Sequence, residues 1–459
     1  MKKLILLALA LPSLASAQSI GGRAAELRDA ALNSDTVAWD FVEGLTTEVG
    51  QRLAGTEAEA RAREWAVRRL TGLGFSNVRI ETFDMPVWVR GEESAEIVSP
   101  FPQRLVLTAL GNSGATPPRG IEAEVVGFDS VAALEAAPDA AVRGKIVFID
   151  HHMMPTQDGS GYGQFGAPRR QGPTIASRKG AVGIIVRSIG TDHHRNPHTG
   201  VQTFGAGAEP IPAAALSVPD AEQLQRILSR GRPVRMHLTL TPRQTGTHQS
   251  GNVVAEVPGT DPAAGVIAIG GHLDSWDLGT GAIDDAAGVA ITVAAAHRIM
   301  QAGPPRRTIR VVLFGAEEPG GFGGDSLYAR HRDENNVVLV GESDFGADRV
   351  WRVEFSLAAA NAALADRIAA SLAPLGILRG PGSADAGTDL GPYRRGGAAA
   401  IDLNQDGTHY FDYHHTPDDT LDKIDPAQLR QNVAAWTAML ALAADAPERI
   451  EPAGAPPAR

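Results

Sequence analysis

From about residue 250 onward, the sequence alternates between short apolar segments typical of buried strands and longer segments typical of helices. Residues 266–269, 308–314 and 337–340 have the strand-like character, and residues 286–300 form an apolar helical segment between the first two. Strands that alternate with helices along a chain lie parallel in one sheet, with the helices covering its faces. This feature predicts an α/β fold with a mixed, largely parallel sheet sandwiched by helices.

The middle of the chain has a different character. Short β-rich runs separated by glycine and proline occur at residues 105–107, 124–126, 145–149 and 181–186. Runs of this kind are typical of a separate β-rich module. The module also contains two long loops, 153–173 and 190–210, and loops of that length in a compact domain are usually functional or mobile.

We therefore expect a discontinuous α/β domain that is interrupted by a β-rich insert. The expected boundaries are residues 18–100 and 246–450 for the α/β domain, 101–245 for the insert, and 451–459 for a flexible tail rich in proline and alanine.

The first 17 residues have the pattern of an export signal. Lys2 and Lys3 precede an apolar run at residues 4–11, and the small residues Ala15-Ser16-Ala17 end the segment. A segment of this kind is a secretory signal peptide and is too short to span a membrane. No later segment has the roughly 18 uninterrupted apolar residues of a transmembrane helix. We expect an exported protein, periplasmic or extracellular, without a membrane span.

Composition excludes several classes of partner and cofactor. The chain of 459 residues has 42 basic and 53 acidic residues and a formal net charge of −11, so we expect no nucleic-acid partner. It contains no cysteine, which excludes disulfides, thiol nucleophiles, iron–sulfur clusters and Cys-type zinc sites. Any bound metal must be held by histidine nitrogen and carboxylate oxygen.

Histidine and acidic residues gather directly after the predicted strands, where open α/β sheets bind their ligands. The segments that carry them are, in chain order, GGHLDS, IDDAAG, GAEE, ESD and HHTPDDT. Two divalent cations need several anionic oxygens, one bridging carboxylate, and a further carboxylate that accepts a proton from water. Neighbouring residues that leave a strand point in different directions, so one member of the pair Glu317-Glu318 can ligate while the other faces the water.

Each of these residues has an ordinary structural alternative when it is considered alone. His272 could be a surface or hydrogen-bonded histidine, and Asp284 could be the N-cap of the following helix. Unpaired acids at the apolar ends of parallel strands are costly unless cations lie among them. The combination therefore favours a site for two metal ions.

The motifs together resemble those of the co-catalytic zinc exopeptidases of the MH clan. They are GGHLDSWDLGTGAIDDAAG at residues 270–288, FGAEEPGGFG at 314–323, GESDFG at 341–346 and HHTPDDT at 414–420. Within this clan the chain resembles the carboxypeptidase Q family, also called plasma glutamate carboxypeptidase. The β-rich module resembles the protease-associated insert of the same proteins, so nearly the whole chain after residue 17 is covered.

The resemblance implies a role for seven residues. One zinc ion would be held by His272, Asp284 and Asp344, and a second by Asp284, Glu318 and His415, with Asp284 bridging. Glu317 matches the general base of the family, and Asp274 matches the carboxylate that orients His272. His414 remains the alternative to its neighbour as a ligand.

The same resemblance implies an exported exopeptidase with two zinc ions per chain, which hydrolyses dipeptides or short peptides with water and a glutamate base. An aminopeptidase that releases N-terminal residues is the first alternative. A catalytically silent binding protein on the same fold is the second, and an amidohydrolase acting on another amide shares the metal chemistry. The sequence leaves open which peptide terminus is recognised, the side-chain preference, the native metal, and assembly as a homodimer.

Overall fold

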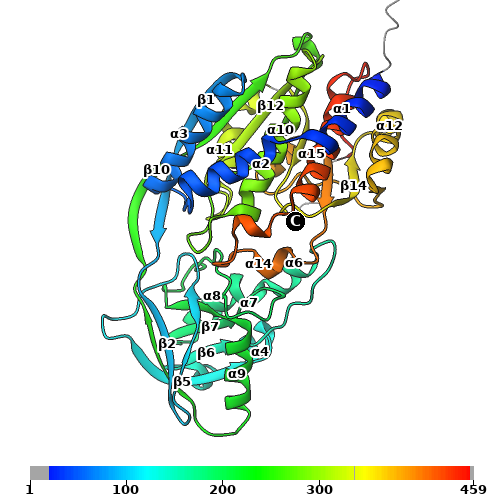
Figure 1. Ribbon diagram of the computed structural model, residues 1–459. Coiled ribbons are helices and arrows are strands. Elements are labelled where there is room, and N and C mark those ends of the chain that lie inside the picture. Colours follow the sequence, from blue (N-terminus) through cyan, green and yellow to red (C-terminus); the bar gives the residue numbers. More distant parts are fainter. Residues whose placement is uncertain (1–19, 335, 455–459) are drawn as a thin grey trace, which may run out of the picture.

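The computed structural model describes residues 20–334 and 336–454. These residues form two eight-stranded sheets, each flanked by helices, and Figure 1 shows the sheets stacked along the long axis of the molecule. The first sheet is in the upper half of that view and the second is in the lower half. The expected signal peptide at residues 1–17 lies outside the described residues.

The first sheet has parallel strands at its centre and antiparallel strands toward its edges. Its strands, in spatial order, are β1 (Ser76–Val89), β10 (Arg243–Val257), β12 (Thr308–Phe314), β11 (Val266–His272), β13 (Val337–Glu342), β16 (Ala399–Gln405), β14 (Val350–Ser356) and β15 (Leu378–Arg379). The four strands β12, β11, β13 and β16 run parallel to one another. The predicted α/β fold with a mixed, largely parallel sheet is confirmed.

Helices cover both faces of the first sheet because successive strand residues point to opposite faces. In β11, Ile267 and Ile269 pack into the core on one face, whereas Ala268 packs into the core on the other. The first face is covered by α1 (Ile20–Ser34), α2 (Val37–Gly44), α3 (Glu57–Gly72), α10 (Ala287–Gln301), α12 (Ala362–Leu372) and α15 (Pro426–Ala444). The second face is covered by α11 (Phe322–His331) and α13 (Gly391–Arg395). The sheet is thus sandwiched by helices.

The second sheet is built from the middle of the chain. Its strands, in spatial order, are β3 (Gln103–Leu105), β2 (Glu93–Ser99), β9 (Arg235–Leu240), β5 (Ile121–Phe128), β6 (Ile146–Ile149), β7 (Gly183–Arg187), β8 (Ala213–Leu216) and β4 (Leu107–Ala109). One face packs on α9 (Val218–Leu228), and the other packs on α4 (Val131–Ala136) and α8 (Gly172–Arg178). This sheet therefore has its own apolar core.

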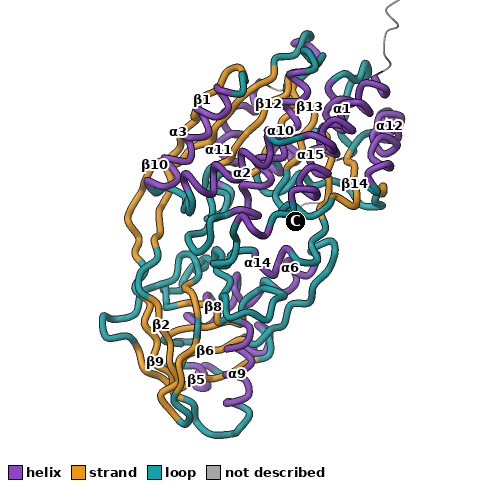
Figure 2. The backbone as a smooth tube through the Cα atoms, in the orientation of Figure 1, coloured by secondary structure: helices purple, strands orange, loops and turns teal. Residues whose placement is uncertain are grey.

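The chain crosses between the two sheets only at two neighbouring points. Strands β1 and β10 pair antiparallel along nearly their whole length, and the crossings follow directly after β1 and before β10 (Figure 2). Arg90 lies at the first crossing and pairs with Asp277 at 2.8 Å and with Glu93 at 3.3 Å. The ion pairs tie the start of the second sheet to the loop after β11.

Two segments differ from the sequence-based expectations. The expected loop at residues 153–173 contains the short helices α6 (Gly161–Phe165) and α7 (Ala167–Arg170), and Pro168 in the first turn of α7 suits a helix start. Residues 451–454 were expected to belong to a flexible tail. Instead, the backbone there bonds to the end of β14 and to the turn after it, since Ala453 N–H donates to the Ser356 carbonyl at 3.4 Å and Ala358 N–H donates to the Glu451 carbonyl at 2.8 Å.

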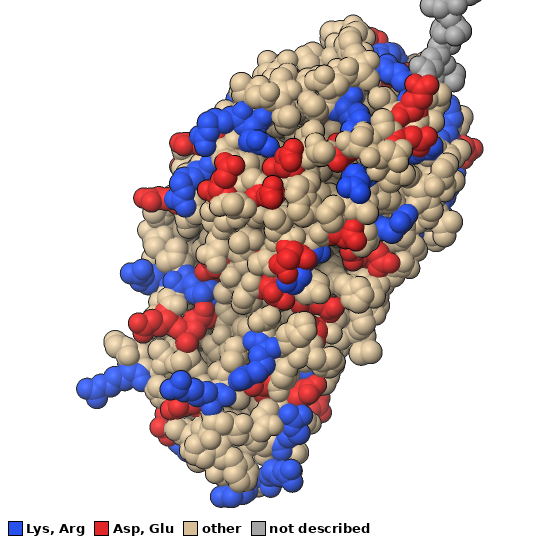
Figure 3. All heavy atoms as spheres, viewed as in Figure 1, with Lys and Arg blue, Asp and Glu red and all other residues tan. Residues whose placement is uncertain are grey.

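The surface carries both signs of charge. Figure 3 shows lysine and arginine interspersed with aspartate and glutamate over the visible face. Within residues 20–334 and 336–454, no helix is long and apolar enough to cross a membrane.

Candidate active site

The predicted site residues converge at one edge of the first sheet. Three parallel strands supply most of them: His272 ends β11, Glu317 and Glu318 follow β12, and Asp344 follows β13. Asp284 lies in the turn η3 (Ala282–Ala286) that leads into α10, and His415 follows the short helix α14 (Tyr410–Tyr413). Parallel strands end at the same edge of a sheet, which is why residues far apart in sequence meet here.

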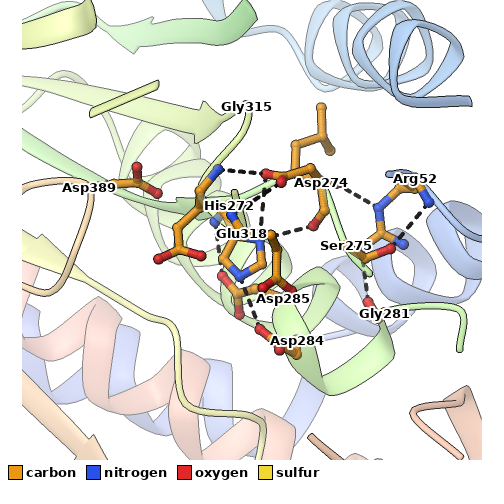
Figure 4. Close-up of polar contacts among 12 residues, drawn as sticks. Arg52, His272, Asp274, Ser275, Gly281, Asp284, Asp285, Gly315, Glu318 and Asp389 are labelled. Carbon is orange, nitrogen blue, oxygen red and sulfur yellow. Dashed lines mark hydrogen bonds and ion pairs between the residues drawn. The ribbon is translucent and has the colours of Figure 1, made fainter. Parts of the chain in front are cut away.

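Asp284 lies between the two histidines of the group, and Figure 4 shows its carboxylate beside His272. Its Oδ1 lies 3.0 Å from His272 Nε2, and its Oδ2 lies 3.2 Å from His415 Nε2. On the first side, His272 Nε2 also lies 3.5 Å from Asp344 Oδ1. On the second side, His415 Nε2 lies 3.0 Å from Glu318 Oε2. The two oxygens of Asp284 therefore face two separate sets of donor atoms.

The separations between these atoms are close to those between the ligand atoms of a zinc ion. Zn–N and Zn–O bonds of about 2.0–2.2 Å in a tetrahedral centre place neighbouring ligand atoms roughly 3.3–3.6 Å apart, and the observed contacts are 3.0–3.5 Å. Three buried carboxylate oxygens also have no hydrogen-bond partner among the described residues: Asp284 Oδ2, Glu318 Oε1 and Asp344 Oδ1. Buried polar atoms are normally paired, so these oxygens are suited to cations.

The second ring nitrogen of each histidine is held by a backbone carbonyl. His272 Nδ1–H donates to the Asp274 carbonyl at 2.9 Å, and His415 Nδ1–H donates to the Thr199 carbonyl at 3.2 Å. A donor at Nδ1 leaves the lone pair on Nε2, which is the nitrogen that faces the carboxylates. Both imidazoles are therefore oriented as metal ligands usually are.

Asp274 differs in detail from the arrangement that the family resemblance implies. Its carboxylate lies 3.8 Å from His272 Nδ1, so the direct hydrogen bond to that ring is made by its main chain. The carboxylate instead accepts backbone N–H groups from Glu317 at 3.0 Å and from Glu318 at 3.3 Å. Asp274 thus connects β11 to the loop that carries both glutamates.

The site residues border a cavity of about 290 Å³. Its walls include Asp284, Glu317, Glu318, Asp344, His414 and His415 from the first sheet and its loops, together with Tyr162 and Arg169 from the middle of the chain. Glu317 is partly exposed, whereas Glu318 is 5% exposed. The neighbouring glutamates therefore have different access to the cavity.

The pKa shifts describe a strongly anionic, buried group. Burial raises the pKa of Asp274 to about 7 and holds that of Glu317 well above its ordinary value. Burial alone would lower the pKa of His272, but the charges of Asp344 and Asp284 hold it well above the ordinary value. Protons therefore offset the negative charge when no other cation is present, and metal ions would displace them.

Further buried residues, which the sequence pattern did not reveal, hold the loops in place. Asp419 accepts N–H groups from Ala282 and Ile283, both at 2.7 Å, and so fixes the turn that carries Asp284. The fully buried guanidinium of Arg52 donates to the Leu273 carbonyl at 2.6 Å. Asp419 could have been suspected from the acidic pair in HTPDDT, whereas nothing in the sequence around Arg52 distinguishes it.

Two further residues are close enough to be considered as ligands. His414 Nε2 lies 3.5 Å from Asp284 Oδ2, and its ring stacks on His415 with the centroids 3.5 Å apart. Asp285 also lies near His272, but its oxygens accept N–H groups from His272 at 3.1 Å and from Gly288 at 3.0 Å. The carboxylate of Asp285 is therefore already occupied by the backbone.

The fold and the site define the class of the protein. A largely parallel α/β sheet whose strand ends gather histidines and carboxylates around one shared aspartate is suited to metal-assisted hydrolysis. The chain belongs to peptidase family M28, whose sequence pattern matches residues 252–440. Carboxypeptidase Q of Bos taurus is 35% identical to it over 409 residues, which cover 88% of this chain and 85% of that protein.

Solved structures agree with this assignment. A peptidase M28 precursor from Shewanella amazonensis SB2B is 44% identical, has a TM-score of 0.92, and is matched over 96% of this chain and 99% of its own. BSAP, a zinc aminopeptidase from Bacillus subtilis, shares the fold with a TM-score of 0.64 at 18% identity, over 91% and 97% of the two chains. The predicted family and its metallo-exopeptidase class are confirmed.

Proposed function

We propose that this M28 exopeptidase is a dinuclear zinc enzyme that hydrolyses dipeptides or short peptides outside the cytoplasm. The observation that carries the proposal is the placement of Asp284, whose two oxygens face two separate sets of nitrogen and oxygen donors. One ion would occupy only one side of this carboxylate. Two ions would engage both sides and also the unpaired oxygens of Glu318 and Asp344.

In this proposal, each zinc ion has one histidine and one terminal carboxylate of its own. The first set is His272, Asp344 and Asp284, and the second is His415, Glu318 and Asp284. We favour His415 over His414 because its Nε2 is near two carboxylates and its Nδ1 is held by a carbonyl. Nδ1 of His414 has no hydrogen-bond partner among the described residues.

Two zinc ions, when bound, would polarise the peptide carbonyl and make water acidic enough to act near neutral pH. Glu317 is the residue of this chain that would accept the proton from water and return it to the departing amine. It lines the cavity beside Glu318, and its backbone N–H is held by Asp274. Asp274 would therefore act as a positioning residue for the base.

Export and substrate size complete the proposal. Residues 1–17 have the pattern of a signal peptide, which supports a periplasmic or extracellular enzyme. The cavity of about 290 Å³ is bordered by loops from both sheets, and a bordered cavity of this size suits a short peptide better than a folded protein. Release of N-terminal residues, as in an aminopeptidase, is the second candidate and would use the same metal chemistry.

Purified mature protein tests the proposal directly. We expect about two zinc ions per chain by elemental analysis and hydrolysis of free dipeptides. We also expect loss of activity with a chelator and recovery when zinc is returned. A protein that binds no metal, or one that hydrolyses peptides equally well after chelation, would contradict the proposal and would favour a binding protein on the same fold.

A further inference from the structure

A second cavity adjoins the cavity of the metal site. It has a volume of about 230 Å³ and shares Asp344, Phe345 and Thr388 with the cavity of the metal site. In the part of the chain that the structure describes, its walls contain no lysine, arginine or histidine but five acidic residues: Asp158, Glu342, Asp344, Asp385 and Asp402. We call this space the acidic pocket. Because three wall residues are shared, a group that leaves the metal site on this side enters the acidic pocket.

One oxygen of Glu342, on the wall of the acidic pocket, lacks a partner. Glu342 ends β13, two residues before Asp344, and is only 9% exposed. Its Oε2 accepts N–H groups from Asp389 and Leu390, both at 2.9 Å, whereas its Oε1 has no hydrogen-bond partner among the described residues. A buried carboxylate oxygen without a partner is costly. A cation in the acidic pocket is the partner that this oxygen lacks.

Asp402 supports the same pocket from the neighbouring strand, β16. Its two oxygens accept N–H groups from Asp385 at 2.8 Å and from Ala386 at 3.2 Å. Burial, together with the charge of Asp385, raises the pKa of Asp402 to about 7, so a cation nearby would favour its charged form. Glu342 and Asp402 thus hold the loop 385–390 from two adjacent strands, and the pocket that they border is fixed in shape.

An aromatic ring forms the wall between the two cavities. Phe345 lines both of them and packs against Tyr410, with the ring centroids 4.5 Å apart. A side-chain carbon at Gly159 or at Gly407 would lie 2.4 Å from this ring, so the backbone holds the ring closely at two points. Lysine and arginine side chains have an apolar stem that packs on such a surface and a charged end that reaches polar groups beyond it. A ring followed by carboxylates therefore suits these two side chains.

The carboxylates of the acidic pocket are too widely spaced for a metal ion. Among the described residues, no three of its five acidic side chains bring ligand atoms within 4.8 Å of one another. Metal ions bind oxygen at about 2.0–2.6 Å and need their ligand atoms that close together. An ammonium or guanidinium group has several N–H donors that point in different directions, so it can serve oxygens that lie further apart. The pocket therefore favours an organic cation.

We propose that the acidic pocket binds the side chain of a lysine or arginine residue that flanks the scissile bond, and so gives the enzyme a preference for basic peptides. This inference rests on the proposed function and adds the class of substrate. Glu342 and Asp402 are not among the proposed zinc ligands, so both remain available to the substrate when two ions are bound. The shared wall at Asp344 and Phe345 places the pocket one side chain away from the metal site.

Dipeptides that differ in one side chain test the inference. Lysyl-alanine and alanyl-lysine are compared with methionyl-alanine and alanyl-methionine, and with the two lysine peptides acetylated on the side chain. We expect wild type to cleave one of the lysine dipeptides with a kcat/KM about tenfold to a hundredfold above that of its methionine counterpart, as charge-assisted hydrogen bonds provide. Acetylation of the side chain should remove this advantage, and arginine in place of lysine should retain it.

Glu342→Gln removes the charge and keeps the shape, since the amide oxygen can still accept the N–H groups of residues 389 and 390. It should lower the ratio of kcat/KM between lysine and methionine dipeptides by about tenfold or more. Glu354→Gln is the matched control and should keep the wild-type ratio. Glu354 accepts the Gly382 N–H at 3.2 Å, close to the same loop, but does not line the acidic pocket.

A second variant acts from the middle region of the chain. Asp158 is exposed, and its Oδ1 accepts the Ser160 N–H at 3.1 Å, which asparagine can also accept. Asp158→Asn should lower the same ratio by about threefold, as expected for an exposed charge, and it serves alone if Glu342→Gln fails to fold or loses zinc. Zinc content and melting temperature are measured for every variant.

Several outcomes would overturn the inference. Equal kcat/KM for lysine and methionine dipeptides, in wild type with its zinc bound, would mean that the acidic pocket does not select the side chain. A lysine preference that survives both Glu342→Gln and Asp158→Asn would have its origin elsewhere. A third metal ion per chain that Glu342→Gln removes would assign the pocket to a metal. Wild type with zinc bound that cleaves none of the dipeptides would instead contradict the proposed function itself, and that result differs from the others.

Discussion

The first sheet and the second sheet border the same cavity, but they supply it with different chemistry. Strand ends of the first sheet bring histidines and carboxylates, among them His272, Glu318 and Asp344. The second sheet reaches the cavity through helices and loops, which bring Arg169 and Tyr162 to its wall and the Thr199 carbonyl to His415. In our account, the anionic edge binds metal ions, and the cationic edge borders the cavity beside it.

The two sheets hold their cavity residues in place in different ways. Residues that follow parallel strands are fixed by the ladder of the sheet and by buried partners such as Asp419 and Arg52. The second sheet depends on close packing of loops, where even Gly200 has no room for a side-chain carbon. Changes to the metal-site residues of the first sheet should therefore affect metal and rate, whereas changes on the second sheet should affect how the substrate binds.

The largest effect is expected for Asp284→Asn on the anionic edge. The change removes the shared charge that faces both sets of donors, so bound zinc should fall well below two ions per chain. Activity should fall by roughly a thousandfold or more, because metal ions contribute several kcal/mol to the transition state. Asp333→Asn is the control, at a side chain that is 96% exposed. A variant that retains both zinc ions and full activity would contradict the bridging role.

Asp274→Asn should have a smaller effect on the same edge. The substitution disturbs the acceptor of the Glu317 and Glu318 N–H groups, and residues that support ligands typically contribute tenfold to a hundredfold in metal affinity or activity. We expect a loss in that range in kcat, with KM changed little. Steady-state kinetics alongside zinc titration check this. A rate unchanged within about twofold would mean that the loop is held without this carboxylate.

On the cationic edge, Gly200→Ala should act through packing. The added carbon would lie 2.0 Å from Arg169 Nη1, at a φ of +138° that disfavours alanine. We expect a loss of about 1–3 kcal/mol in the free energy of unfolding and a raised KM, measured by denaturant unfolding and kinetics. Gly207→Ala, in the same loop with φ of +75° and no atom within 4 Å, separates backbone strain from the contact. If Gly200→Ala and Gly207→Ala lower the free energy of unfolding and raise KM equally, the contact with Arg169 does not contribute to the effect.

The smallest effect is expected far from the cavity, at Glu81 on β1. Burial tends to raise the pKa of Glu81, but the hydrogen bond from His331, at 2.8 Å, and Arg79 lower it below its ordinary value. A depressed pKa stabilises the fold above the unfolded-state pKa, and this contribution is lost as pH falls through the folded-state pKa.

Glu81→Gln should therefore lower the free energy of unfolding by about 1 kcal/mol at pH 7 and by less near pH 3, with kcat/KM unchanged. Asp84→Asn, at an exposed position of the same strand, is the control. Unfolding curves at both pH values check the sign. A larger loss at pH 3 than at pH 7 would contradict the assignment.

Much of the fold was predictable because its signals are local. The apolar strands at 266–269 and 308–314 and the helical segment at 286–300 were identified from periodicity and composition, and the structure has strands β11 and β12 and helix α10 there. Strand β14 and helix α12 were not identified, since half-buried positions in β14 and exposed positions in α12 interrupt the apolar pattern.

The site residues were predictable where acidic residues directly follow strands. They were less predictable where contacts between distant parts of the chain determine the position of a side chain. His272 and Glu318 stand at strand ends that the sequence marks clearly. The hydrogen bond from His415 to Thr199 joins residues 216 positions apart, and no local pattern encodes it. Arg169 shows the same limit, because its neighbour Arg170 has the same side chain and faces solvent.

The measurement that tests the central proposal most directly compares wild type with Glu317→Gln. Zinc content and the rate of dipeptide hydrolysis are determined on the same samples. We predict that the variant retains about two zinc ions per chain and loses roughly a hundredfold to ten-thousandfold in kcat, as expected when a general base is removed. A variant as active as wild type, with its zinc in place, would show that Glu317 is not the base and would contradict this account.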